Sequence, residues 1–179
     1  MITREQLKSI TKKQVLIFLC VAVFVYFFFV CYDWQELSDA AVDDYTGNIA
    51  YLTADTMNLF VNDREGNLVF FKTFDSHGRG GYLWYNEGIL YVEFPSRDLL
   101  VAINEAGEIM SETTLSEPLR RNPWQQGWIK EGRKYVFYYE DITYCYDQSN
   151  YFRNHFLNQR RTLSLISKNG DIQELWVSS

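Results

Sequence analysis

The sequence has little cysteine, with three in 179 residues. Cys20 and Cys31 lie in or beside a long apolar run, so Cys145 stands alone in the rest of the chain. One cysteine cannot form a disulfide within its own domain. This excludes the class of small secreted domains held together by disulfides, and the fold must depend on a hydrophobic core. Between two tyrosines, Cys145 is expected to be a buried small apolar residue.

Histidine is scarce as well, and no catalytic motif is present. His77 and His155 lie far apart in the sequence, which gives little support for a metal site. His77 lies in a glycine-rich stretch, residues 75–81, but the Lys-Ser/Thr pair of a phosphate-binding loop does not follow it. The neighbours Glu140 and Asp141 are expected to be solvated at a hairpin tip. We therefore predict no cofactor and no metal, and favour a protein that is not an enzyme.

Charge is absent from residues 15–32, which read VLIFLCVAVFVYFFFVCY. As a helix this run would span roughly 27 Å, close to the thickness of the hydrocarbon core of a bilayer. A helix also satisfies its own backbone hydrogen bonds in lipid. The run ends in bulky phenylalanines without a small-residue cleavage pattern, so we predict an uncleaved transmembrane helix. Cleavage and secretion are the alternative.

Basic residues are outnumbered after this run. Of the 17 basic and 23 acidic residues, four basic and one acidic precede it, so the outer part is strongly acidic. Because positive flanks stay in the cytoplasm, the N-terminus is predicted inside and the long C-terminal part outside. The acidic outer part argues against a nucleic-acid partner. The predicted segments are a cytoplasmic tail (1–14), a transmembrane helix (15–32), a helix end and linker (33–47) in which the helix continues through Leu37 and Ala41, and an extracytoplasmic all-β domain (48–179).

From residue 48 helical spacing is absent, and short β-rich runs alternate with turn residues. Some runs, such as residues 68–71 and 135–139, are apolar at successive positions, which predicts strands covered on both faces. The domain is therefore predicted to be antiparallel and all-β. The predicted strands are 48–53, 57–62, 67–74, 81–86, 89–94, 98–104, 108–115, 127–130, 134–140, 142–148, 161–167 and 171–177.

A weak internal repeat runs through these strands. Apolar runs at 59–61, 101–103 and 165–166 each precede a turn that ends in glycine, at Gly66, Gly107 and Gly170. The first two glycines are 41 residues apart, the size of one four-stranded propeller blade, and the last two are 63 apart. The longer spacing predicts an insertion, for which residues 147–160 are the candidate.

In this pattern residues 48–177 resemble bacterial β-propeller repeat proteins. The resemblance implies about three blade-like units, fewer than the four to eight of closed propellers. The domain is then a partial propeller, an open stack, or part of an assembly that other chains complete. A β-sandwich or a barrel is the alternative architecture.

Aromatic residues make up 17% of the chain and give the best candidates for a contact surface. Trp124 and Trp128 follow a predicted loop, residues 118–123 (PLRRNP). Exposed tryptophan beside arginine is typical of surfaces that contact sugars or proteins, whereas the same rings could instead fill the core. The candidate contact residues are Trp124, Trp128, Arg120, Arg121, Tyr82 and Trp84.

These features together predict a single-pass protein of the cell membrane. Its outer β domain is expected to act as a protein-interaction or assembly module of the cell envelope, with another protein or a second copy as partner. A glycan- or peptide-binding domain and an envelope hydrolase are the alternative functions. The sequence does not identify the partner.

Overall fold

A computed structural model of the chain describes residues 17, 19–21, 37–54, 56–75, 80–117, 119, 124, 127–148 and 161–178. The chain divides into two compact units, Met1–Trp34 and Gln35–Ser179. In the first unit the described residues are α-helical, and the rest of the predicted transmembrane run lies outside the described residues. In the part of the chain that the structure describes, no helix combines the length and the apolar character needed to cross a bilayer.

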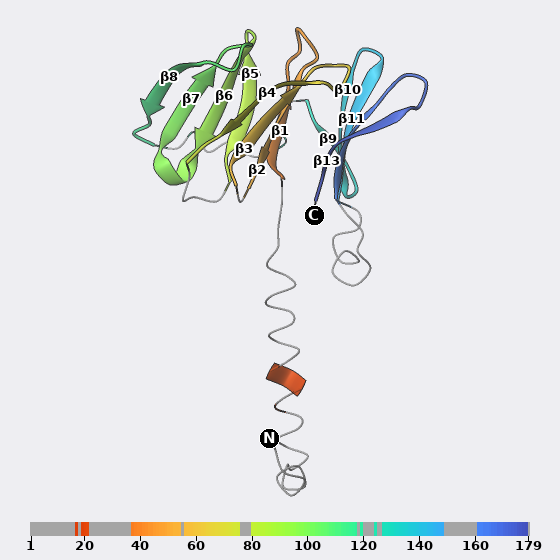
Figure 1. The fold of residues 1–179 in the computed structure, drawn as a ribbon, viewed down its shortest axis with the longest axis horizontal. Coiled ribbons are helices and arrows are strands. Elements are labelled where there is room, and N and C mark those ends of the chain that lie inside the picture. The colour runs from red at the N-terminus through yellow and green to blue at the C-terminus, as the bar shows by residue number, and fades with distance from the viewer. Residues whose placement is uncertain are drawn as a thin grey trace, which may run out of the picture. The chain divides into compact units, whose positions relative to one another are not determined.

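The second unit is built from antiparallel sheets whose strands follow one another in the chain (Figure 1). Most strands pair with their sequence neighbours through short turns, as in the blade of a propeller. The prediction of an antiparallel all-β domain is confirmed for the described residues of the second unit, in which Pro95–Arg97 form one short 3-10 turn. The first sheet contains β1 (Leu37–Val42), β2 (Ile49–Thr53), β3 (Asn58–Asn62) and β4 (Leu68–Thr73); the second contains β5 (Tyr82–Asn86), β6 (Ile89–Phe94), β7 (Leu99–Ile103) and β8 (Ile109–Thr114); the third contains β9 (Ile129–Glu131), β10 (Lys134–Tyr139), β11 (Ile142–Asp147), β12 (Thr162–Ile166) and β13 (Ile172–Val177).

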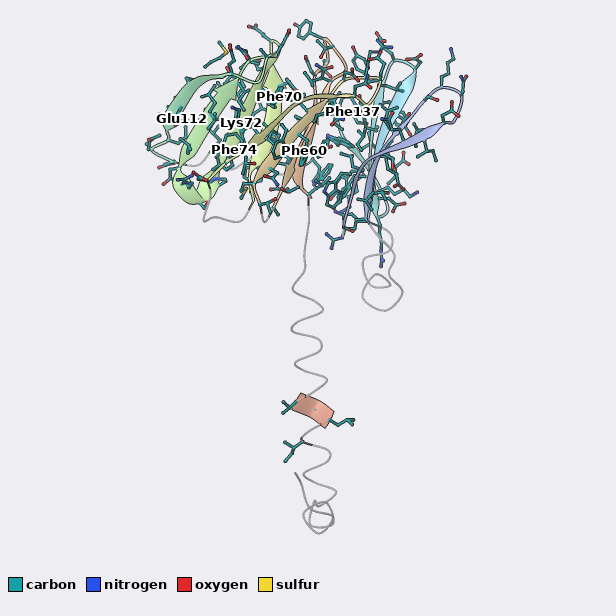
Figure 2. All side chains as sticks on the ribbon, viewed as in Figure 1. Phe60, Phe70, Lys72, Phe74, Glu112 and Phe137 are labelled. Atoms are coloured by element: carbon teal, nitrogen blue, oxygen red, sulfur yellow. The ribbon has the colours of Figure 1, made fainter. Side chains whose placement is uncertain are left out.

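The first sheet lies between the other two, and each of its faces belongs to a different hydrophobic core (Figure 1). Successive side chains of a strand point to opposite faces. Ala50 and Val61, which are opposite each other in the register, face the second sheet. Tyr51 and Phe60 face the third sheet and belong to the same core as Phe137. Phe60 and Phe137 are labelled in Figure 2. A sheet covered on both faces explains why β2 is buried at every position.

The predicted repeat is confirmed, because the three glycines close equivalent turns. They connect the last two strands of each sheet, β3 to β4, β7 to β8 and β12 to β13. Each glycine N–H donates to the carbonyl three residues earlier at 2.9 Å, and φ lies between +80° and +86°. Glycine adopts this region without a steric penalty. The first residue of each turn, Asp63, Asn104 or Ser167, also accepts the backbone N–H of the residue four positions later on its side-chain oxygen.

About half of the extra length between Gly107 and Gly170 lies in the third sheet at the predicted insertion, and most of the rest precedes β10. There β11 ends at Asp147 and β12 begins at Thr162. The equivalent connections of the first and second sheets are residues 54–57 and 95–98. The extra chain therefore lies between β11 and β12, which correspond to the second and third strands of the four-stranded sheets when the additional strand β9 is set aside.

Strand β1 corrects the prediction for residues 33–47. The helical continuation through Leu37 and Ala41 is wrong, because Leu37–Val42 pair with β2 from Leu37 opposite Thr53 to Val42 opposite Ile49. All but one of the six residues in β1 are buried. β1 is an edge strand of its sheet, yet it is buried on both faces, and this burial outweighs the weak local preference of the short run for helix. The second unit, Gln35–Ser179, is called the β unit from here on, and its strands begin before residue 48.

Candidate interaction surface

Asp39, on β1, joins three parts of the β unit. Its Oδ1 accepts the N–H groups of Ala40 at 2.9 Å and Trp124 at 2.6 Å, and its Oδ2 accepts the N–H of Leu83, on β5, at 2.8 Å. Burial raises the pKa of the Asp39 carboxyl to about 7, although the three N–H donors act to lower it. The carboxyl is a structural junction, because its oxygens are occupied by the backbone of its own unit.

Ser38 strengthens the same link between β1 and β5. Its hydroxyl donates to the carbonyl of Gly81 at 2.7 Å and accepts the N–H of Gly81 at 2.7 Å. A Cβ on Gly81 would lie 2.7 Å from a Leu52 methyl and 2.9 Å from the carbonyl oxygen of Glu93. Glycine is therefore required here by close packing.

Trp124 and Trp128, the leading predicted contact residues, lie in the core between the first and third sheets. They are only 7% and 8% exposed. Trp124 stacks on Tyr146 with ring centroids 4.5 Å apart and planes at 2°. The Trp128 indole N–H donates to the carbonyl of Ala40 at 2.9 Å. These rings form part of the core, as in the alternative that the sequence left open.

Of the other four predicted contact residues, the structure describes two, Trp84 and Tyr82. Trp84 is buried and stacks on Tyr91 at 5.3 Å. Tyr82 is half-exposed and lies opposite Glu93 in the sheet. Buried Glu93 accepts the N–H of Leu119 at 2.7 Å, so the chain after β8 passes close to this position. The remaining candidates, Arg120 and Arg121, lie outside the described residues.

A pocket of about 370 Å³ lies where the first sheet meets the third. Arg64, on the β3–β4 turn, reaches across to the β10–β11 turn, where it pairs with Glu140 at 3.0 Å and Asp141 at 3.3 Å. The adjacent carboxylates raise the pKa of the Arg64 guanidinium. Glu140 and Asp141 are exposed at a hairpin tip as predicted, but their pairing with Arg64 was not predicted. Sequence alone does not place these two turns side by side.

The outer strand β4 is less covered than its sequence predicts. Leu68, Val69 and Phe71 are exposed, and only Phe70 packs into the core shared with the second sheet (Figure 2). The prediction that residues 68–71 are covered on both faces is therefore wrong. An edge strand has no neighbour beyond it, so an apolar run does not ensure burial there.

The third sheet presents apolar side chains on the face opposite its core. Phe137 points into the core, so its neighbour Tyr138 points away and is 59% exposed. Ile172 lies on the same outer face and is 68% exposed, and Ile129, opposite Val136 in the register, also lies on that face and is exposed. Exposed apolar residues grouped on one face are typical of interaction sites. The sequence signal was the apolar run 135–139, which predicted coverage on both faces.

The structure does not bring the residues considered for catalysis or metal binding together among those it describes. Cys145 is half-buried, and burial raises the pKa of its thiol. His77 and His155 lie outside the described residues. Among the described residues, no three His, Cys, Asp or Glu side chains are close enough to hold a metal ion.

Comparison with known proteins gives no family. No family model matches the chain, and no curated protein matches it. Three solved structures show low similarity: Hsv2 of Kluyveromyces lactis (TM-score 0.37, 8% identity, 65% of this chain and 34% of that one), virginiamycin B lyase from Staphylococcus aureus with quinupristin (0.38, 14%, 78% and 56%), and a protein of unknown function from Bacteroides caccae (0.35, 11%, 79% and 66%). The chain spans between about a third and two thirds of the length of these proteins. At these TM-scores the similarities establish neither a family nor a function.

Proposed function

We propose that this chain is a single-pass membrane protein whose outer β unit is a three-bladed propeller segment and a protein-interaction module of the cell envelope. In this proposal residues 15–32 form the anchor, the N-terminus is cytoplasmic and the β unit lies outside. The apolar run and the contrast between a basic N-terminal tail and an acidic remainder support the anchor and its orientation.

One observation carries the interaction role: Tyr138, Ile172 and Ile129, on three strands of the third sheet, are each exposed on its outer face. Contact with a partner would remove these side chains from water, at about 25 cal/mol for each Å² of apolar surface. The predicted contact surface around Trp124 and Trp128 receives less support, because both rings are in the core. We therefore place the contact surface on the third sheet.

Photo-cross-linking tests this role in the full-length chain within its native membrane. A photoreactive phenylalanine analogue replaces Tyr138, and the control carries it at Tyr45, which is 76% exposed on the β1–β2 turn. The Tyr138 probe should give a specific adduct with a protein, and the Tyr45 probe should not. Adducts of equal yield at both positions, or none at either, would disprove an interaction surface on the third sheet.

A reporter that is active only outside the cytoplasm tests the anchor independently. Fused after Ser179, it should be active, and protease added from outside should digest the β unit and leave a small membrane-bound fragment. The matched control carries Arg at both Val23 and Phe27, each charge costing about 2.5–3.5 kcal/mol near the bilayer centre. This control should lose membrane retention or export. An inactive reporter on the unmodified chain would overturn the orientation.

A further inference from the structure

The two junctions between sheets share one contact, in which a glycine turn lies on the last strand of a neighbouring sheet. A Cβ on Gly107, in the second sheet, would lie 2.7 Å from Cγ of Phe70, on β4 of the first sheet. A Cβ on Gly66, in the first sheet, would meet the side chain of Gln173, on β13 of the third. Gln173 also donates to the Gly66 carbonyl at 3.2 Å. Each turn thus occupies the same kind of position on its neighbour.

The register shows that these positions are equivalent. Counted from the glycine turn, Phe70 and Gln173 each belong to the second pair of opposite residues, with Val61 and Leu165 as their partners. The residue at this position in the second sheet is Ser111, opposite Ala102. Ser111 and the rest of β8 are exposed, and a Cβ on Gly170 would have no atom within 4 Å. Among the described residues, the Gly170 turn therefore has no neighbouring strand and Ser111 has no turn lying on it. These two positions are at opposite ends of the stack of sheets.

The unmatched ends also carry complementary charges. At the junction of the first and third sheets, Arg64 of the glycine turn pairs with Glu140 of the β10–β11 turn. Lys168 takes the place of Arg64 in the Gly170 turn. Glu87 takes the place of Glu140 in the β5–β6 turn, and both glutamates have positive φ, +52° and +48°. The cation and the glutamate of the internal junction thus recur, one at each end.

We propose that a second copy of this chain closes the stack into a ring. The Gly170 turn of each copy lies on β8 of the other at Ser111, and Lys168 of each copy lies beside Glu87 of the other. This inference rests on the proposed interaction role and names its partner. Two copies supply six sheets, within the range of closed propellers. A two-fold axis through the centre of the ring makes the two contacts identical. It also gives both chains the same orientation along that axis, so that the chain segments preceding both β1 strands leave the same face of the ring, as two anchors in one membrane require.

Cysteine cross-linking of full-length chains in membranes tests the ring. Two differently tagged copies are co-expressed, one with Ser111→Cys and one with Asn169→Cys, and Cys20, Cys31 and Cys145 are replaced by Ala in both. A short bismaleimide should link the two tags. Ser111→Cys paired with Tyr45→Cys is the matched control, and it should remain unlinked because Tyr45 lies on the β1–β2 turn of the middle sheet, which takes no part in the proposed contact.

Other outcomes overturn the proposal in distinguishable ways. Linking of Ser111→Cys to itself would indicate two β8 edges paired side by side. No linking of the Ser111 and Asn169 variants, with the Tyr138 probe attached to a different protein, would leave the interaction role intact and exclude the second copy. No adduct in either experiment would defeat both proposals.

Exchange of the two charges provides the second measurement. Lys168→Glu alone and Glu87→Lys alone should each weaken self-association about threefold to tenfold, because exposed pairs contribute modestly and the contact occurs twice. The double variant should restore the yield of cross-linked chains. If the double variant were as weak as the product of the single variants, Lys168 and Glu87 would not be in contact and the proposed alignment would be wrong.

Discussion

The two junctions of the first sheet differ in chemistry. The core shared with the second sheet is mainly aliphatic, with Leu52, Leu59, Leu90 and Val92 among its buried residues. Half of the buried residues in the core shared with the third sheet are aromatic, mostly tyrosines and tryptophans, against a single phenylalanine in the other core. The first two sheets are consecutive in the chain, whereas the second sheet separates the first from the third in sequence.

Directional hydrogen bonds accompany the aromatic junction. Tyr144 donates to the carbonyl of Gly47 at 2.6 Å, and Tyr51 donates to that of Leu175 at 3.0 Å. These partners are 97 and 124 residues apart in sequence. A short connection already restricts how the first two sheets meet, but the third sheet has no such restriction. Its position is therefore defined by side chains that combine apolar area with a polar group.

Trp124→Ala should have the largest effect on this comparison. Removing a buried ring from the aromatic core is expected to lower the free energy of unfolding by about 3–5 kcal/mol. Leu90→Ala in the aliphatic core should cost about 2–5 kcal/mol, and exposed Tyr45→Ala less than about 0.5 kcal/mol. Because the first sheet shares both cores, thermal melts of all three variants should show one transition. Two separate transitions would mean that the junctions unfold independently.

The pH dependence of stability tests Asp39, which contacts both sides of the comparison. Its pKa is about 7 in the folded protein against an ordinary 3.8, so folding favours the protonated carboxyl. The stabilisation is complete below about pH 4 and is lost as the pH rises through 7, to a limit of about 4 kcal/mol. Denaturant unfolding at a series of pH values should show this fall for the wild type and not for Asp39→Asn. Parallel curves for the two proteins would refute the assignment to Asp39.

Tyr144→Phe removes one directional contact and leaves the ring. The carbonyl of Gly47 loses its buried donor, at an expected cost of about 1–3 kcal/mol. The control is Tyr138→Phe, whose hydroxyl is exposed and 3.5 Å from Glu131, and its cost should be close to zero. Denaturant titration measures both. Equal costs would show that the hydroxyl of Tyr144 does not define the aromatic junction.

Substitutions in the glycine turns should change the stability least. They compare a turn at a junction between sheets, Gly107, with the uncovered turn at the end of the stack, Gly170. Gly170→Ala should cost about 1 kcal/mol through its positive φ alone, since its surroundings are open. Gly107→Ala should cost more, because the added methyl also meets Phe70. Melting of the membrane-extracted monomer measures both. A greater loss for Gly170→Ala than for Gly107→Ala would contradict the assignment of Gly170 to the free end.

Much of the fold could be predicted because its signals are local. Glycine turns with an Asp, Asn or Ser at the first position indicate hairpins by themselves, and their spacing located the insertion after Asp147. Strand β1 was missed because its sequence, LSDAAV, is short and follows an apolar run that favours helix. Its extended conformation depends on pairing with β2, which no local pattern reveals.

The candidate site was less predictable because it depends on the order in which the sheets stack. Trp124 has the composition of a contact residue, but the third sheet returns beside the first and buries it. Arg64 and Glu140 are 76 residues apart and meet only through that stacking. Tyr138 was recognised as part of an apolar run, yet it is exposed because none of the described sheets packs on the outer face of the third sheet.

The central position of the first sheet has a consequence for biosynthesis. This sheet is made before the other two, and the second sheet can cover one of its faces while translation continues. The face that carries Tyr51 and Phe60 must wait for β10–β13, which are made last. A growing chain therefore displays an uncovered aromatic surface until its final strands emerge. We expect this interval to be the time at which aggregation competes most strongly with folding and a chaperone has most to protect.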